Sequence, residues 1–273
     1  MEVRDWQGRT GESWAAEWKR TDRSFGGLTE RLLARTREFP LRDVVDIGCG
    51  AGELSVAVAR GRPEAQVVGV DISPQLIAVA KERAAHHANV RFVEADAATW
   101  RPDDGLQPNF FMSRHGVMFF AEPTGAFANL ASIAAPRANL LFSCFRDVRE
   151  NPFFHELAAL LPAPASPPDP RAPGPFAFSD RGYVTEILES AGWNDVRFEA
   201  HNFAMIAGAG DDPVDDAVSY FTRIGAAALA LSEMDDVDRQ TTLLRIRDFA
   251  RENCRDGVVA LRAATWIVTA NLD

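Results

Sequence analysis

Between residues 43 and 145, short apolar runs alternate with longer stretches in which apolar residues recur at helical spacing. The stretch "SPQLIAVAKERAAHH" predicts a helix, because Ser73 is a good N-cap and Pro74 suits the first helical position. The five apolar runs that predict strands are "DVVDIG", "AQVVGVDI", "NVRFVEAD", "NFFMSRHGV" and "ANLLFSCF". Strands that alternate with helices in this way indicate an α/β fold, with a mostly parallel, doubly wound sheet and helices on both faces.

The pattern changes after the fifth run. Residues 161–176, "LPAPASPPDPRAPGPF", contain seven of the sixteen prolines, which excludes a helix or a central strand there. A disordered linker and an ordered loop over a site both fit such a segment, and the phenylalanines around it favour the ordered loop. Beyond it the sequence predicts a capped helix, a sixth strand, two helical stretches and a last strand; these are "SDRGYVTEILESAGW", "DVRFEAHNFAM", "DDPVDDAVSYFTRIGAAALAL", "DDVDRQTTLLRIRDFAREN" and "GVVALRAATWIVTANL".

We therefore expect an N-terminal helical cap over residues 1–40 and a main domain over residues 41–273, in which 146–180 and 205–255 are cap or insert segments. Trp14 and Trp18 are four residues apart, which places them on one face of a helix. That face either packs on the main domain or covers a ligand site. In the second case both tryptophans bind substrate.

Composition narrows the class of protein. The apolar fraction is 47%, the charged fraction is 25% and the formal net charge is −10, so the chain is globular and nucleic acid is an unfavourable partner. Three widely spaced cysteines indicate neither a disulfide framework nor a zinc site. Asp147 and Glu150 do not have the spacing of a metal-binding acid pair, so we expect no metal. The chain shows no signal-peptide pattern and no run long enough to span a membrane, so a cytoplasmic location is expected. A homodimer is among the partners that the sequence allows.

The glycine-rich segment "VVDIGCGAGELS" follows the first strand and opens a helix. Gly48 and Gly50 permit left-handed backbone angles and let a ligand lie against the chain. A dinucleotide fingerprint would place glycine at position 53, where this chain has Glu53, at the helix N-terminus that would otherwise hold a pyrophosphate. Asp46 adds a second acid. The two carboxylates disfavour a phosphate ligand and suit a cationic one.

Two further acids follow neighbouring strands. Asp71 ends the second strand, where a carboxylate can accept both hydroxyls of a ribose. Asp96 ends the third strand and, with the Ala97 amide, can meet the edge of a purine ring. A ligand with an adenosine, no phosphate and a positive charge fits these positions, and S-adenosylmethionine (SAM) has those features.

Three segments, "VVDIGCGAGELS", "VVGVDISPQLIAVAKERA" and "VRFVEADAATW", resemble the first motifs of class I SAM-dependent methyltransferases. The segments "SRHGVMFFAEP", "NPFFHELAALLP", "APGPFAFSDRGYVTEILESAGW" and "ATWIVTAN" resemble a bacterial group related to the ubiquinone/menaquinone-biosynthesis methyltransferases. The resemblance implies a Rossmann-like, seven-stranded sheet with an antiparallel last strand. It also implies that Asp46, Gly48 and Gly50 line the methionine part of SAM, Asp71 the ribose, and Asp96, Ala97 and Ile72 the adenine. For Ile72 and Ala97, plain core packing is the alternative.

The chain departs from that group at two positions near the fourth strand. Asn109 stands where the group usually has an acid, and His115 stands where it usually has an aromatic residue. The carboxyl end of this strand, Ser113 to Gly116, should border the ligand crevice, so Ser113 is a predicted cofactor contact. His115 is the candidate general base, with packing on the cofactor as the alternative. Arg114 is the second candidate catalytic residue; it either orients the substrate or pairs with a carboxylate such as Asp46 or Glu94.

Three more residues are predicted to line the acceptor site: Arg146, His155 and Phe176. The sequence thus predicts a SAM-dependent methyltransferase that modifies oxygen or carbon of a small, largely apolar molecule, aromatic or prenylated. Two alternatives stay open. One is a SAM-binding protein of the same fold with lost or different activity, which the asparagine at position 109 keeps in play. The other is an NAD-dependent oxidoreductase.

Overall fold

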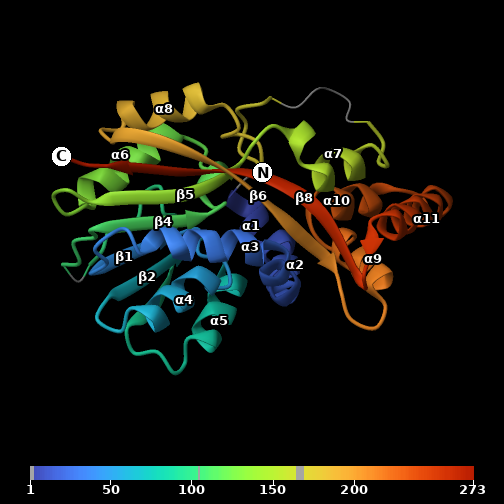
Figure 1. The fold of residues 1–273 in the computed structure, drawn as a ribbon, viewed down its shortest axis with the longest axis horizontal. Helices are drawn as coiled ribbons and strands as arrows, with labels where there is room; N and C mark the ends of the chain where they lie inside the picture. Colours follow the sequence, from blue (N-terminus) through green and yellow to red (C-terminus); the bar gives the residue numbers. More distant parts are fainter. Residues whose placement is uncertain (1–2, 104, 164–168) are drawn as a thin grey trace.

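A computed structural model describes residues 3–103, 105–163 and 169–273, which form one α/β structure around a central sheet (Figure 1). The strands of this sheet run in the order β3-β2-β1-β4-β5-β8-β6, and a two-residue strand, β7, pairs with β8 off this path. Their bounds are β1 (Asp43–Ile47), β2 (Gln66–Asp71), β3 (Val90–Glu94), β4 (Phe110–Arg114), β5 (Asn139–Phe145), β6 (Asn194–Gly208), β7 (Cys254–Arg255) and β8 (Val258–Asn271). Strands β1 to β5 pair in parallel, and β8 is antiparallel to both β5 and β6. The predicted doubly wound sheet is confirmed, and β7 adds a short eighth strand to the seven expected.

Helices cover both faces of the sheet. Figure 1 shows α6 and α8 on one side and α3, α4 and α5 on the other. The helix bounds are α1 (Val3–Gln7), α2 (Arg9–Ala16), α3 (Trp18–Thr36), α4 (Glu53–Gly61), α5 (Pro74–Arg83), α6 (Pro123–Ile133), α7 (Pro152–Ala158), α8 (Arg181–Ser190), α9 (Pro213–Phe221), α10 (Gly225–Glu233) and α11 (Asp236–Glu252), with 3₁₀ turns η1 (Val117–Phe119) and η2 (Val148–Glu150). Burial on both faces explains why the central strands are apolar throughout: Phe110, Phe111 and Met112 of β4 are all fully buried.

The last two long strands reach beyond the rest of the sheet. Strand β8 pairs with β5 only over Thr265–Asn271, whereas its pairing with β6 continues to Val259. Figure 1 shows these two strands extending toward α9 and α11. The segment 205–255, predicted as an insert, therefore begins as the end of β6. The sequence predicted a single helix over residues 211–231, but the structure has two. Helix α9 ends at Phe221, and α10 begins at Gly225, whose φ of +70° interrupts the helical backbone.

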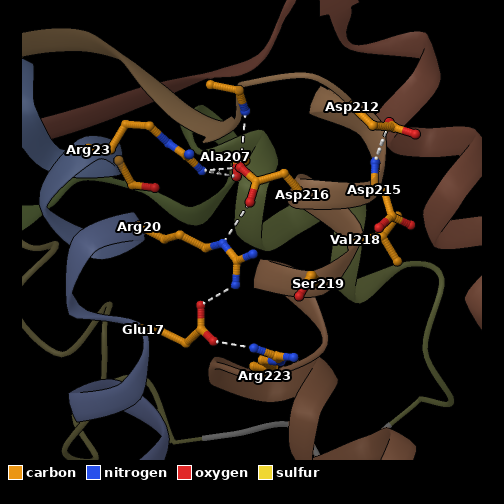
Figure 2. Close-up of polar contacts among 12 residues, drawn as sticks. Glu17, Arg20, Arg23, Ala207, Asp212, Asp215, Asp216, Val218, Ser219 and Arg223 are labelled. Atoms are coloured by element: carbon orange, nitrogen blue, oxygen red, sulfur yellow. Dashed lines mark hydrogen bonds and ion pairs between the residues drawn. The ribbon is translucent and has the colours of Figure 1, made fainter.

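The N-terminal helices are fastened to this extension by ion pairs (Figure 2). Arg20 of α3 donates to Glu17 and to Asp216 of α9, each at 2.7 Å. Arg223 reaches the same Glu17 at 2.8 Å. Arg23 donates to the Ala207 carbonyl of β6 at 2.8 Å. Glu17 is only 3% exposed, so its two arginine partners are what permit its burial.

Within the proline-rich segment 161–176, residues 164–168 lie outside the described residues. Its second half is held to the domain: the Gly174 amide donates to the Met118 carbonyl, and Phe178 is 1% exposed. The Phe176 ring lies 5.0 Å from that of Phe154 and 5.8 Å from that of Phe145. The prediction of an ordered loop is confirmed for this half.

The helices in the described part of the chain include none that is both long and apolar enough to cross a membrane.

Asn109, one of the departures noted in the sequence, lies at the amino end of β4. Its side-chain oxygen accepts from the amides of Arg42 and Asp43 at 3.0 and 2.9 Å, and its amide nitrogen donates to the Pro40 carbonyl at 2.6 Å. An aspartate could accept the first two hydrogen bonds but could not donate the third. This residue therefore fastens the chain where it enters β1, at the end of the sheet opposite the glycine loop.

We expect Asn109→Ala to lower the free energy of unfolding by about 1–3 kcal/mol, because three hydrogen bonds are lost at once. Urea denaturation measures this change, and Asn139→Ala, which removes one hydrogen bond to Arg137, is the matched control. Ligand binding at the carboxyl edge of the sheet should not change. A stable Asn109→Ala protein that no longer binds its ligand would contradict this structural role.

Candidate functional site

The glycine loop joins β1 to α4 at the carboxyl edge of the sheet. Gly48, Gly50 and Gly52 have φ angles of +62°, +54° and +79°, a region that other residues rarely adopt. A Cβ atom on Gly48 would lie 2.8 Å from the Cα of Gly116, so the chain segments leaving β1 and β4 touch here. A Cβ on Gly50 would meet nothing within 4 Å. The backbone at Gly50 is therefore open to a ligand, as the sequence predicts.

Asp71 ties the glycine loop to the end of β2. Its two oxygens accept from the amides of Gly50 and Ser73, at 2.8 and 2.9 Å. Burial raises the pKa of this carboxyl, while the amides of Ser73 and Gly50 oppose the rise. A carboxylate has about four lone-pair positions. Asp71 can thus hold the loop and still accept the hydroxyls of a ribose.

Asp46 lies deeper, beneath α4. It is 1% exposed and accepts a hydrogen bond of 2.5 Å from the Ser55 hydroxyl. Burial raises its pKa to about 7, against the opposing effects of Ser55 and Arg114. Near pH 7 this carboxyl is therefore partly protonated and contributes only part of a negative charge beneath the loop.

The residues predicted for the adenine follow β2 and β3. Asp96 accepts from the Ala98 amide at 2.9 Å, which closes the turn after β3. Ile72 is half-buried, whereas Ala97 is 7% exposed and belongs to the hydrophobic core. Asp96 and Ile72 lie at adjacent strand ends as expected. The burial of Ala97 favours the alternative for this residue, which is core packing.

Arg114 pairs with partners other than those predicted. Its guanidinium forms an ion pair with Glu53, donates to Thr29 Oγ1 at 2.8 Å and lies 3.7 Å from Asp22. Neither Asp46 nor Glu94 forms an ion pair with it, which corrects the expectation. Asp22 and Thr29 come from α3, so the N-terminal helix contributes to the site. The one sequence signal for this is the spacing of seven residues, two helical turns, between Asp22 and Thr29 on the side of α3 that also carries the core residue Phe25.

Arg83 is a second residue that the sequence analysis missed. It donates to the Ala51 carbonyl of the glycine loop at 2.8 Å and to Asp22 at 2.7 Å. Its guanidinium also lies 4.1 Å from the centre of the Trp18 ring. Trp18 is therefore linked to the glycine loop through Arg83. Trp14 belongs to α2, because the helix ends at Ala16 and α3 begins at Trp18, so the single helical face predicted for the two tryptophans is wrong.

His115 has a left-handed backbone, with a φ of +64°. Its ring stacks on Phe145 at 4.1 Å and meets Phe25 edge-on at 5.4 Å. Nδ1 lies 3.4 Å from the Ser143 hydroxyl, and within the described residues Nε2 has no hydrogen-bond partner. Burial, reinforced by the Arg114 charge, lowers the pKa of the ring to about 3. The ring is neutral near pH 7 and a weak base, which favours the packing role over general-base catalysis.

The Ser113 hydroxyl has a positioning role, and its predicted contact with the cofactor stays a prediction. Its hydroxyl donates to the Ile47 carbonyl at 2.7 Å and accepts from the Gly116 amide at 3.1 Å. The side chain is fully buried. It therefore joins the exits of β1 and β4 from inside the protein.

The predicted acceptor residues are only partly brought together. Phe176 joins a group of rings that includes Phe145 and Phe154. Arg146 is held by Glu150 and Asn202 and lies 4.9 Å over the Trp266 ring. His155 is exposed on α7, which does not support its predicted place in a cavity. The Trp14 ring lies 5.9 Å from that of Trp6, which in turn meets Phe119 edge-on at 5.2 Å.

Helix α2 lies directly over the carboxyl edge of the sheet. A Cβ atom on its Gly11 would come within 2.4 Å of the Ser73 hydroxyl, at the start of α5. A ligand at this edge would therefore lie beneath α2 and α3. A surface hollow of about 370 Å³ between Arg42, Asp43 and residues 105–107 lies at the opposite edge of the sheet.

The similarity of this chain to known proteins is concentrated in the segment that contains the glycine loop. The profile of a family described as a methyltransferase domain matches residues 44–137. The chain is 33% identical over 105 residues to the trans-aconitate 2-methyltransferase of Acidovorax sp. (strain JS42), which covers 38% of this chain and 39% of that protein. It is 31% identical over 106 residues to the malonyl-[acyl-carrier protein] O-methyltransferase of Halalkalibacterium halodurans, with 38% and 39% covered. The alignment thus spans about two fifths of the length of these curated relatives.

Solved structures extend the similarity of fold to the whole chain. Magnesium protoporphyrin IX methyltransferase from Synechocystis PCC 6803 superposes with a TM-score of 0.57 at 15% identity, covering 99% of this chain and 98% of that one. Phosphoethanolamine N-methyltransferase 2 from Haemonchus contortus gives a TM-score of 0.58 at 16% identity, with 100% and 60% covered. At such identities the likeness shows a shared Rossmann-like fold.

The buried carboxyl of Asp46 predicts a pH-dependent stability. Its folded-state pKa of about 7 exceeds the usual value near 4, so its bound proton stabilises the fold most at low pH, and this contribution disappears as the pH rises through 7. Asparagine resembles the protonated form. We therefore expect Asp46→Asn to gain stability relative to the unmodified protein as the pH rises from about 4 to about 7, by roughly 1.4 kcal/mol for each pH unit, and to gain no more above about pH 7.

Thermal or urea unfolding at a series of pH values measures this difference. Asp147→Asn is the control, because its partner Arg149 lowers the pKa of Asp147 to about 2 and no change is expected in that pH range. Parallel stability curves for the unmodified protein and Asp46→Asn would contradict a raised pKa at Asp46.

Proposed function

We propose that this chain is a SAM-dependent methyltransferase that acts on a small molecule. The observation that carries the proposal is the glycine loop, open at Gly50 and bordered by the carboxylates of Asp46, Glu53 and Asp71. Such a loop suits a ligand that carries an adenosine and a positive charge. The family profile matched by residues 44–137 supports this assignment, as do the solved neighbours whose titles name bound SAM or SAH (S-adenosylhomocysteine).

The residues present fit the cofactor. Asp71 would hold the ribose, Gly48 and Gly50 would allow its close approach, and Asp96 with Ile72 would contact the adenine. SAM supplies an activated methyl group on its sulfonium. Because methyl transfer is a displacement, this chain's main contribution would be to align the acceptor and exclude water, which α2 and α3 can do by covering the strand ends.

The acceptor is proposed to be a small, largely apolar molecule, methylated on oxygen or carbon. The support is a group of aromatic side chains near the exit of β4, made of Phe25, Phe145, Phe154 and Phe176. The names of two relatives specify trans-aconitate and a malonyl group on acyl-carrier protein as their acceptors, the second an O-methylation. The cap formed by residues 1–40, 146–180 and 205–255 would enclose the acceptor, and the narrower similarity to the ubiquinone-related group stays a prediction.

The two alternatives are less well supported. An NAD-dependent oxidoreductase would place a pyrophosphate at the start of α4, where Glu53 and its partner Arg114 lie. A protein of lost activity was suggested by Asn109. That residue lies at the other end of β4, so its departure from the family pattern is no argument for lost activity at the site.

We expect SAM and SAH to bind this protein and NAD to fail to bind, because the loop ends at a carboxylate. Isothermal titration calorimetry with the three ligands tests this directly. Release of a methyl group into a panel of phenols, prenylated compounds and carboxylic acids then tests transfer. Binding of NAD without binding of SAM would refute the proposal.

His115→Phe should retain turnover to within about tenfold, since removal of a true general base costs about 10²–10⁴-fold. The ring stacks between Phe25 and Phe145 and is a weak base, so phenylalanine can take its place. Steady-state rates with an acceptor found in the panel measure the effect, and exposed His155→Phe is the control. A loss of a hundredfold or more, with unchanged SAM binding, would restore His115 as the base.

A further inference from the structure

His115 carries a buried nitrogen that no group in the described part of the chain satisfies. Four buried side-chain nitrogens there have no hydrogen-bond partner, and they belong to Arg35, His115, Arg146 and His201. Among these four residues, His115 is the one that is itself buried, at 9% exposed. A buried polar atom without a partner costs free energy, because water can no longer bind it, and in a folded protein it calls for an explanation.

The packing of the His115 ring does not require this nitrogen. Phe145 stacks on the ring at 4.1 Å and Phe25 meets it edge-on at 5.4 Å. A phenylalanine would make both contacts without burying a polar atom. The φ of +64° adds a second local cost, and strained backbone of this kind is concentrated at functional sites. Packing alone therefore does not account for a histidine at this position.

The other ring nitrogen decides what Nε2 can do. Nδ1 lies toward β5, 3.4 Å from the Ser143 hydroxyl. Burial and the Arg114 charge lower the pKa of the ring, and a hydrogen bond with the Ser143 backbone opposes them. A bond that favours the protonated ring is one in which a ring N–H donates to a carbonyl oxygen. Because only one nitrogen of a neutral imidazole carries hydrogen, Nε2 has a lone pair and can accept a hydrogen bond but not donate one.

His115 also lies between the glycine loop and the aromatic group. The next residue, Gly116, touches the loop, since a Cβ atom on Gly48 would lie 2.8 Å from the Cα of Gly116. On the other side, the ring of Phe145, on which His115 stacks, lies 4.9 Å from the ring of Phe154. A molecule held between the loop and these rings would meet mainly apolar side chains and one polar atom, Nε2 of His115.

We propose that Nε2 of His115 binds the methyl acceptor by accepting a hydrogen bond from a hydroxyl or N–H group, so that the site selects an apolar molecule with such a donor at the end facing the glycine loop. This inference rests on the proposed function and specifies the chemical class of its acceptor. The hydrogen bond orients the acceptor and leaves its proton in place, because the ring is a weak base. A compound without the donor would leave Nε2 buried and unpaired, and the site would discriminate against it.

Three probes of similar shape test this selectivity on the SAH-loaded protein. p-Cresol carries a hydroxyl donor, p-xylene has a methyl group in its place, and 4-methylanisole keeps the oxygen but lacks the hydrogen. Isothermal titration calorimetry gives the ratio of the p-cresol affinity to the p-xylene affinity, and we expect this ratio to fall about 10- to 100-fold in His115→Phe. Comparing the ratio between proteins cancels the unequal hydration of the probes. 4-Methylanisole should behave like p-xylene.

Two further variants separate the hydrogen bond from packing. His201→Phe is the matched control, because the His201 ring also stacks on a phenylalanine and its Nε2 also lacks a partner among the described residues, yet it is only half-buried, on β6. It should leave the ratio unchanged. His115→Gln supplies an acceptor oxygen near the place of Nε2 and should keep most of the preference for p-cresol. Turnover of a saturating acceptor should still stay within tenfold in His115→Phe, because the variant loses binding of the acceptor.

A second readout uses the unmodified protein and so covers the case in which His115→Phe does not fold. In nitrogen-15 NMR of the histidine rings, His115 is the ring that stays neutral at pH 5, since its pKa is about 3. Its Nε2 should show the resonance of a nitrogen without hydrogen, which moves when p-cresol is added and not when p-xylene is added.

Three results would overturn the proposal: an affinity ratio unchanged in His115→Phe, an Nε2 that carries the hydrogen, or an Nε2 resonance that does not respond to p-cresol. Each of these can be observed while SAH is bound, so the proposed function would stand. Failure of the unmodified protein to bind either SAM or SAH would instead refute the proposed function.

Discussion

The contact between the backbones of Gly48 and Gly116 is the constraint on which the rest of the site depends. A Cβ atom at Gly48 would come within 2.8 Å of Gly116, and one at Gly116 would come within 2.6 Å of the Ile47 carbonyl. The Ser113 hydroxyl bridges the same two segments. Because β1 and β4 leave the sheet in contact, the glycine loop, Arg114 and His115 meet at one place. Larger residues at these glycines would separate the loop from the side chains that follow β4.

The chemistry that can occur at this place is set by charge. The carboxyl groups of Asp46, Glu53 and Asp71 disfavour a phosphate and favour a cation, while Arg114 balances the charge of Glu53 by an ion pair. The aromatic rings beyond His115 form an apolar neighbourhood. A cationic methyl donor beside an apolar acceptor site is the arrangement that such a division of charge supports.

The sequence predicts those features of the site that are local in the chain. The glycine loop, the acid at the end of β2 and the antiparallel last strand each follow from residues near one another or from a family pattern, and the structure has them. The partners of Arg114 could not be predicted in this way. Glu53 is 61 residues away from it and Thr29 is 85 residues away, and only the docking of α3 brings them together.

Helix boundaries and backbone conformation explain what else the sequence could not predict. Trp14 and Trp18 have helical spacing, yet the chain ends one helix and begins another between them, where Glu17 pairs with Arg20 and Arg223. For His115, the sequence gives no sign of the left-handed backbone that stacks its ring on Phe145. The depth of burial, and with it the lowered pKa, is likewise a property of the assembled core.

The charged side chains of α3 fix its position along the helix axis, which its apolar face cannot do alone. Phe25, Leu28 and Leu32 bury the helix in the core, but hydrophobic contact is non-directional and specifies the position of a helix along its axis only weakly. Arg20 and Arg23 fix one end of the helix to α9 and β6. Asp22 binds Arg83, which donates to the glycine loop, and Thr29 binds Arg114 at the end of β4. A shift of α3 by one turn would break both sets of polar contacts and would separate Glu17 from Arg223. The ion pairs that fix the register of α3 therefore also fix where its carboxylate meets the loop, so the geometry of the cap and that of the ligand site depend on the same few contacts.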